Sequence, residues 1–165
     1  MMHVKWRGLE LPASVILDEK SATDTFGRFT IEPFERGFGT TIGNSLRRIL
    51  LSSIEGSAIT SIRVKGADHE FCTIEGVTQD MVDIVLNVKG LIVNVDSDEE
   101  KVLRLSASGP GEVTADLIEA DPSVTVYNPN HVIATLTDSI DFEMELTIGR
   151  GRGYVPAAEQ YATKD

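Results

Sequence analysis

The stretch from residue 29 to residue 54 most constrains the fold, because its pattern changes from strand to turn to helix over a short distance. It reads FTIEPFERGFGTTIGNSLRRILLSSI. Pro33 cannot donate a ladder hydrogen bond and pushes Glu32 into an extended conformation, so the strand ends at this pair. A glycine-rich turn follows. We predict a helix from about residue 44 to residue 54, with Asn44 or Ser45 as its N-cap.

This predicted helix carries more apolar surface than one small sheet can cover. Its main apolar arc has the spacing of one helical face and consists of Leu46, Ile49, Leu50 and Ile54. Leu51 lies well off that arc. We therefore expect the helix to pack on its own sheet with one side and on another subunit or domain with the other.

Composition and charge exclude several classes of protein. The chain has 165 residues, of which 41% are apolar and 25% charged, as in an ordinary globular protein. It contains no apolar run of roughly 18 residues and no N-terminal signal pattern, so we expect a cytoplasmic protein without a membrane span. A net charge of −11 disfavours direct binding to nucleic acid. With Cys72 as the one cysteine, an internal disulfide and a cysteine-rich zinc site are excluded.

The pattern changes after Glu55-Gly56, where we predict a domain boundary. Residues 58–64 alternate as a strand, with Ala58, Thr60, Ile62 and Val64 predicted on one side. A second helix is predicted over residues 77–88, with Thr78 as its N-cap and Gly90 at the C′ position. Its core face should consist of Val77, Met81, Ile84, Val85 and Val88. Val82 and Leu86 point elsewhere and indicate a partner.

From residue 91 onward the chain is almost entirely strand and turn. The clearest strand covers residues 140–148, where apolar residues alternate with Asp141, Glu143 and Glu145. Such alternation is typical of an antiparallel strand with one buried and one wet face. Other strands are predicted at 15–17, 23–31, 91–95, 102–107, 113–117, 124–127 and 132–136. The fold class is therefore α+β.

A competing reading of the glycine turn is a dinucleotide-binding loop. Gly37, Gly39 and Gly43 lie between a strand and a helix, where such loops occur. However, the preceding strand is half polar, the next strand ends without an acidic residue to hold a ribose, and the later chain lacks further βα units. Nucleotide binding is therefore the minor alternative, and a free-standing β-rich interaction domain is a third.

The remaining chemical signals are weak. His69, Glu70 and Cys72 resemble a nucleophile site, but no second histidine with an orienting acid accompanies them. Arg150 and Arg152 could contact RNA, although in so acidic a chain a loop whose arginines meet carboxylates of a partner is favoured. We predict no catalytic residue, no cofactor and no metal site.

Four segments together resemble one family, the N-terminal domain of the bacterial RNA polymerase alpha subunit. They cover nearly the whole chain in the family's order. They read ERGFGTTIGNSLRRILLSSIEG at residues 35–56, HEFCTIEGVTQDMVDIVLNVKGL at 69–91, HVIATLTD at 131–138 and RGRGYVPA at 150–157. The resemblance implies a scaffold subunit of DNA-directed RNA polymerase, a nucleotidyltransferase whose catalytic magnesium is held by the beta and beta′ subunits.

The resemblance also implies contact surfaces. The homodimer interface would contain Leu46, Ile49, Leu50, Leu51 and Ile54. The beta subunit would contact Glu35, Arg36, Gly37, Gly39, Asn44, Arg47 and Arg48, together with His69, Glu70 and Phe71. The beta′ side would meet Val82 and Leu86. No direct contact with nucleic acid is implied for this region.

In that family the dimerisation domain is discontinuous, and a mostly antiparallel β domain carrying one helix is inserted between its halves. By this resemblance residues 1–56 are the N-terminal half of the α/β dimerisation domain, 57–150 the inserted domain, and 151–165 a loop and tail. The returning half would follow residue 161. We therefore expect this polypeptide to expose apolar surface around Leu46, Leu50 and Leu51, and to dimerise or assemble poorly by itself.

Overall fold

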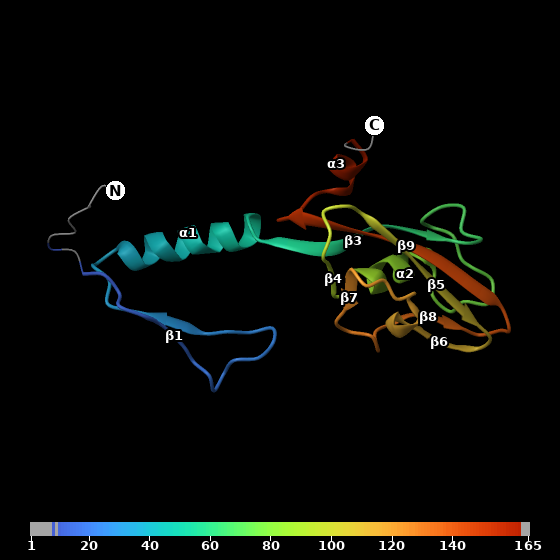
Figure 1. The fold of residues 1–165 in the computed structure, drawn as a ribbon, viewed down its shortest axis with the longest axis horizontal. Helices are drawn as coiled ribbons and strands as arrows, with labels where there is room; N and C mark the ends of the chain where they lie inside the picture. Colours follow the sequence, from blue (N-terminus) through green and yellow to red (C-terminus); the bar gives the residue numbers. More distant parts are fainter. Residues whose placement is uncertain (1–7, 9, 163–165) are drawn as a thin grey trace. The chain divides into compact units, whose positions relative to one another are not determined.

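A computed structural model describes residue 8 and residues 10–162 (Figure 1). The described elements follow one another along the chain as β1 Val15–Leu17, β2 Phe29–Ile31, α1 Phe38–Ser52, β3 Glu55–Val64, α2 Met81–Lys89, β4 Val93–Val95, β5 Lys101–Ser108, β6 Gly111–Thr114, the 3₁₀ turn η1 Ala115–Leu117, β7 Val124–Val126, β8 Val132–Leu136, β9 Asp141–Arg152 and α3 Ala157–Ala162. Every pairing between the described strands is antiparallel. The predicted α+β class is confirmed.

The chain divides between Ser52 and Ser53 into two compact units. Unit 1 contains the β1–β2 hairpin and α1, and unit 2 contains all later elements. The division lies close to the predicted boundary at Gly56, although β3 already begins at Glu55. The assignment of these units to the domains of a larger protein stays a prediction.

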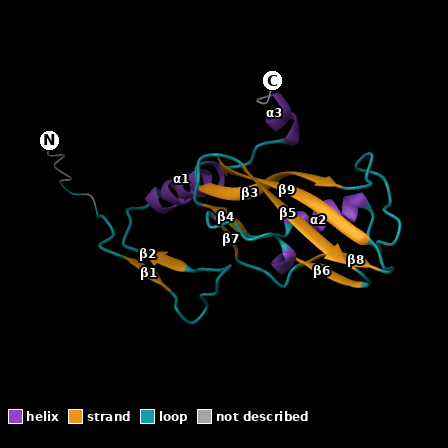
Figure 2. Cartoon of the chain, turned by 45° about the vertical axis from the view of Figure 1, so that its right-hand side comes forward, coloured by secondary structure: helices purple, strands orange, loops and turns teal. Residues whose placement is uncertain are grey.

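Unit 2 is organised around a sheet of three strands in the order β3-β9-β5 (Figure 2). The pairs β4–β7 and β6–β8 form two smaller sheets, and α2 packs against β8 and β3. Along β9 the side chains of Phe142, Met144, Leu146 and Ile148 are buried, which confirms the predicted alternation. The wet face carries ion pairs between strands, such as Lys65 Nζ with Glu143 Oε1 at 2.8 Å.

The predicted start of the first helix is wrong. α1 begins at Phe38, so Gly39 and Gly43 lie inside the helix, and only Gly37 has a positive φ, of 93°. Neither Asn44 nor Ser45 is an N-cap; the Ser45 hydroxyl instead donates to the Thr41 carbonyl at 2.9 Å. The helix also ends at Ser52, before the predicted Ile54. Glycine is a poor helix former, and its presence concealed the first turns.

The second helix begins later than predicted. α2 starts at Met81 with Asp80 as its N-cap, since the Asp80 carboxylate accepts from the Asp83 N–H at 2.8 Å. Thr78 is not the cap, and Val77 precedes the helix. Gly90 is a C-cap in right-handed conformation, with φ −78°, and not a left-handed C′ residue. Met81, Ile84 and Val88 are buried as predicted, whereas Val85 is half-buried.

Several strands also differ from their predictions. A bulge at Thr60 shifts the alternation of β3, so Ile59 packs on the core and Ala58 is exposed. The strand predicted over residues 113–117 ends at Thr114, and the chain then forms the 3₁₀ turn η1. β2 is shorter than the predicted 23–31 strand, because Thr23 and Phe26 pair in a turn. β9 continues to Arg152, so the predicted loop around Arg150 is a strand.

Candidate functional site

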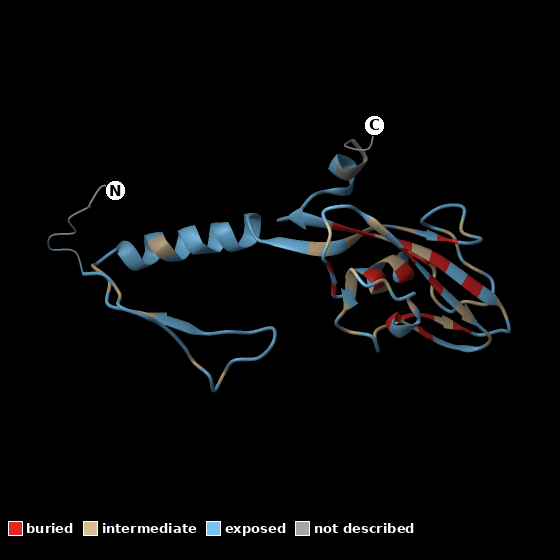
Figure 3. Ribbon diagram, viewed as in Figure 1, coloured by how far each residue is buried: buried red, intermediate tan, exposed pale blue. Residues whose placement is uncertain are grey.

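Unit 1 has no buried side chain among its described residues. Red, which marks burial in Figure 3, is confined to unit 2, and all core residues follow Ser53. In the hairpin Val15, Ile16 and Phe29 are exposed, and no residue of α1 is buried. A helix and hairpin that bury none of their apolar side chains lack the packing that normally stabilises such elements.

One face of α1 is broadly apolar. Leu46 and Leu50 are 43% and 60% exposed, and Ile49 lies beside them on the helix. The early start of α1 lengthens this face by two residues that the sequence analysis missed, Ile42 and Phe38, which precede Leu46 by four and eight positions. The predicted dimer residues Leu46, Ile49 and Leu50 are thus brought together. Ile54 lies outside α1 and belongs to unit 2.

The opposite side of α1 combines cations with an apolar residue. Leu51, 65% exposed, follows Arg47 by four positions and Arg48 by three, so the three share one helical face. Within the described part of the chain neither guanidinium has an ion-pair partner. Exposed arginines beside a leucine are a composition that protein interfaces favour. Leu51 therefore lies apart from the other predicted dimer residues of α1.

The remaining predicted residues before Arg47 surround the start of α1. The carbonyl of Glu35 accepts from the Phe38 N–H at 3.1 Å, which forms the turn into the helix. Arg36 and Gly37 are exposed in this turn, and Asn44 is exposed on the helix. Gly39 lies within the first helical turn, so it is not available as a loop residue.

The loop at residues 69–71 of unit 2 presents an aromatic side chain. Phe71 is 76% exposed, and its N–H donates to His69 Nδ1 at 3.2 Å. His69 and Glu70 are also exposed. The loop is joined to the start of α2, because the Met81 N–H donates to the Cys72 carbonyl at 3.1 Å. Cys72 itself is half-buried and packs against the core.

The outer face of α2 carries the two residues predicted for the beta′ side. Val82 and Leu86 are exposed, whereas Ile84 and Val88 point into the core. Since positions four apart share a helical face, Val82 and Leu86 form one small apolar strip. Unit 2 therefore presents separate apolar surfaces at the loop and along α2.

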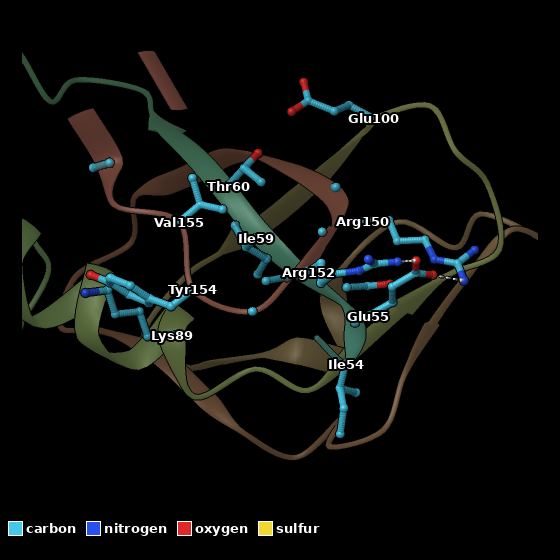
Figure 4. A pocket seen from close by; sticks show the side chains of 17 residues that line it. Ile54, Glu55, Ile59, Thr60, Lys89, Glu100, Arg150, Arg152, Tyr154 and Val155 are labelled. Carbon is cyan, nitrogen blue, oxygen red and sulfur yellow. Dashed lines mark hydrogen bonds and ion pairs between the residues drawn. The ribbon is translucent and has the colours of Figure 1, made fainter. Parts of the chain in front are cut away.

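The arginines predicted to meet a partner's carboxylate bind Glu55 of their own chain (Figure 4). Arg152 Nη2 donates to Glu55 Oε1 at 2.8 Å, and Arg150 Nη2 donates to Glu55 Oε2 at 3.1 Å. The hydrogen bond from Arg152, then the positive charges of both arginines, hold the pKa of the Glu55 carboxyl below its ordinary value. The sequence gives no direct signal for this cluster, because it depends on the register of β3 and β9.

A cleft of about 680 Å³ lies beside this cluster. Its lining includes Ile59 and Thr60 of β3, which Figure 4 shows close to Val155, and Tyr154, which is drawn next to Lys89. Of its lining residues, Glu55, Arg150 and Arg152 are joined by ion pairs. Among the described residues no three His, Cys, Asp or Glu side chains gather as metal ligands. No described helix is long and apolar enough to cross a membrane.

Comparison with known proteins identifies the family. The family model described as RNA polymerase Rpb3/RpoA insert domain matches residues 61–165. The chain belongs to this family. The matched residues lie entirely within unit 2.

The similarity to individual relatives covers nearly the whole chain and therefore includes unit 1. The chain is 53% identical over 158 residues to the DNA-directed RNA polymerase subunit alpha of Rhodopirellula baltica, covering 96% of this chain and 48% of the relative. To the same subunit of Geobacter metallireducens it is 46% identical over 156 residues, covering 94% and 46%. The chain thus spans about half the length of these curated relatives. The resemblance to the alpha subunit is confirmed.

Proposed function

We propose that this chain is the N-terminal part of a non-catalytic alpha subunit that pairs with a second copy of itself and then recruits the beta and beta′ subunits of an RNA polymerase. The observation that supports this most is that unit 1 buries no described side chain, in a chain similar to alpha subunits. Apolar surface of this extent needs a second surface to cover it, from a further segment of the same subunit or from a partner. Nucleotidyl transfer would belong to the assembled polymerase.

The self-contact would use the broad apolar face of α1. Leu46, Ile49 and Leu50 lie on one side of a straight stretch of helix, so two copies related by a two-fold axis could cover one another's leucines. The cores of homodimer interfaces are more apolar than ordinary surface, which fits this face. A single contact of this kind would leave Leu51 uncovered, because Leu51 lies on the other side of α1.

The contact with the beta subunit would use the arginine side of α1 and the loop at residues 69–71. Arg47 and Arg48 could bind carboxylates or carbonyls of the large subunit, while Leu51 and Phe71 supply apolar area. The strip formed by Val82 and Leu86 would face the beta′ side. Support for these assignments is the exposure of every side chain involved.

The test of the beta contact is the variant Arg48→Ala in the full-length subunit. If Arg48 is a hot spot, its loss should cost about 2 kcal/mol, which is about a 30-fold weaker capture of beta in a co-purification titration. Arg28→Ala is a matched control, because Arg28 is an exposed arginine of unit 1 outside the proposed contacts. Undiminished capture by Arg48→Ala, or equal loss in the control, would refute the role of Arg48.

The test of the self-contact is Leu46→Asp combined with Leu50→Asp, which would bury two carboxylates at a two-fold interface. We expect the full-length dimer to dissociate to monomers in sedimentation equilibrium. Leu11→Asp introduces one charge at another exposed leucine of unit 1 and should leave the dimer intact. A dimer that survives the double substitution would exclude this face as the interface.

The alternative of a nucleotide-binding enzyme has lost its main support. Two of its three glycines, Gly39 and Gly43, are helical, so no glycine loop precedes the helix. Isothermal titration with nucleotides separates the alternatives, because the scaffold function predicts no specific heat of binding. The alternative of a free-standing interaction domain predicts that no polymerase subunit co-purifies.

A further inference from the structure

The end of the β3–β9 ladder that contains Gly56 and Gly151 should be only weakly stabilised by packing, because of the residues that form it. Beyond the Ala58–Gly149 pair, the register continues through Ser57–Arg150, Gly56–Gly151 and Glu55–Arg152. None of these six residues is buried. The Gly56–Gly151 pair has no side chains to pack across the strands, and glycine weakens a strand.

The Glu55 carboxylate spans this weak pair. Glu55 stands directly opposite Arg152, and Arg150 lies two positions along β9 on the same face. Each carboxylate oxygen accepts from a different guanidinium, Oε1 at 2.8 Å and Oε2 at 3.1 Å. One carboxylate is therefore hydrogen-bonded on both sides of the glycine pair, in the charge-assisted form that is stronger than a neutral hydrogen bond.

Two further contacts hold the same end of the ladder together. The N–H of Gly153 donates to the Ile54 carbonyl at 3.2 Å, one position beyond the last paired residues. Arg150 Nη1 lies 3.8 Å from Asp98 Oδ1, which gives this guanidinium a second anionic neighbour. The start of β3 and the end of β9 are thus held together by side chains where apolar packing is missing.

We propose that Glu55, Arg150 and Arg152 form an electrostatic clamp that keeps the Gly56–Gly151 end of the β3–β9 ladder closed. The clamp determines whether Ile54 and Gly153, which flank the ladder and line the cleft, stay side by side. It acts on the opening of this end and not on global unfolding. The inference rests on contacts within unit 2 alone and does not depend on the proposed scaffold function.

The test is amide hydrogen exchange of the whole chain with the variant Glu55→Gln, which keeps the shape of the side chain and removes its charge. Peptides covering residues 54–58 and 149–154 should exchange about two- to fivefold faster, because exposed ion pairs have small effects on local opening. Peptides covering residues 103–105 and 144–147 should not change. In 1 M NaCl the wild-type chain should approach the variant, since the Debye length falls to about 3 Å.

Glu143→Gln is the matched control, because it removes an exposed ion pair with Lys65 near the other end of β3. It should leave residues 54–58 and 149–154 unchanged. In a chain that already carries Arg150→Gln and Arg152→Gln, the added Glu55→Gln should have no further effect. Unchanged exchange in Glu55→Gln, equal acceleration in the control, or an undiminished effect without the arginines would each overturn the clamp.

Discussion

Glu55 shows how one residue acquires its properties from a register that the local sequence does not specify. In the sequence it marks the end of a helix and a change of pattern, while in the structure it is the shared acceptor of two arginines. Arg150 and Arg152 were expected to bind a carboxylate, and both bind one. Within the described chain this carboxylate is that of Glu55, and a contact with a partner's carboxylate stays a prediction.

The carboxyl of Glu55 should therefore titrate below its ordinary pKa of 4.5. Because the folded-state pKa is lowered, the contribution of the clamp is fully present above pH 4.5 and is lost as the pH falls through the lower folded-state value. Carboxyl-detected NMR of the side chain measures this midpoint, and Arg152→Ala should raise it. A midpoint that does not respond to Arg152→Ala would contradict the assigned cause. The neighbouring charges that the titration must include are Arg150, Arg152 and Asp98.

Gly76 is required for two separate reasons, a positive φ of 77° and a close neighbour. A Cβ at this position would lie 3.0 Å from Ile140 Cδ1 and 3.1 Å from Cγ2. We expect Gly76→Ala to lower the free energy of unfolding by more than the roughly 1–2 kcal/mol of a left-handed alanine. Gly109→Ala, with φ 84° and open space around the Cβ, should show the backbone cost alone. Urea unfolding followed by circular dichroism measures the free energy of unfolding of both variants. Equal decreases in the two variants would mean that Ile140 moves away from the new Cβ without lowering the stability.

At the scale of the element, α2 depends on a cap that sequence pattern alone did not identify. Asp80→Ala removes the acceptor for the Asp83 N–H and should cost about 1 kcal/mol of unfolding free energy. Thr78→Ala should cost less than about 0.5 kcal/mol, because Thr78 is exposed and is not the cap. The same urea titrations decide the matter. A greater loss in Thr78→Ala than in Asp80→Ala would reverse the assignment.

Elements with strong periodicity were predictable, and elements shaped by a local exception were not. The buried residues of β9 and of α2 follow from their spacing, since each lies on one side of a single core. The start of α1 did not follow, because Gly39 and Gly43 disfavour a helix in isolation. The bulge at Thr60 reversed half of the β3 pattern, and nothing in a two-residue period marks such an insertion.

At the scale of the candidate site, the exposure of the apolar side chains was predictable from the sequence. Which of these side chains lie together on one surface was predictable only in part. Leu46, Leu50 and Leu51 are all exposed in the single chain, as expected from the resemblance, whereas the helix pattern had predicted that one side of α1 packs on its own sheet. Their division between two sides of α1 follows from helical geometry once the helix is defined. The Glu55 cluster could not be predicted, because it joins residues from β3 and β9 that only the tertiary register brings together.

For the whole 165-residue chain we expect association that is not confined to one species. α1 exposes apolar side chains on both of its sides, so contacts through Leu50 and through Leu51 compete. Sedimentation velocity at micromolar concentration should therefore show a broad or concentration-dependent distribution. A clean, monodisperse dimer would contradict this expectation.

The absence of a described core in unit 1 has a thermodynamic consequence. Side chains that no described residue covers gain their burial only when a second surface arrives, so for this chain the folding of unit 1 and its binding become one equilibrium. Its melting temperature should then rise with protein concentration by mass action, while that of unit 2 stays fixed. Two transitions, of which only one moves on dilution, would be the calorimetric signature of a subunit whose first segment is completed by its neighbour.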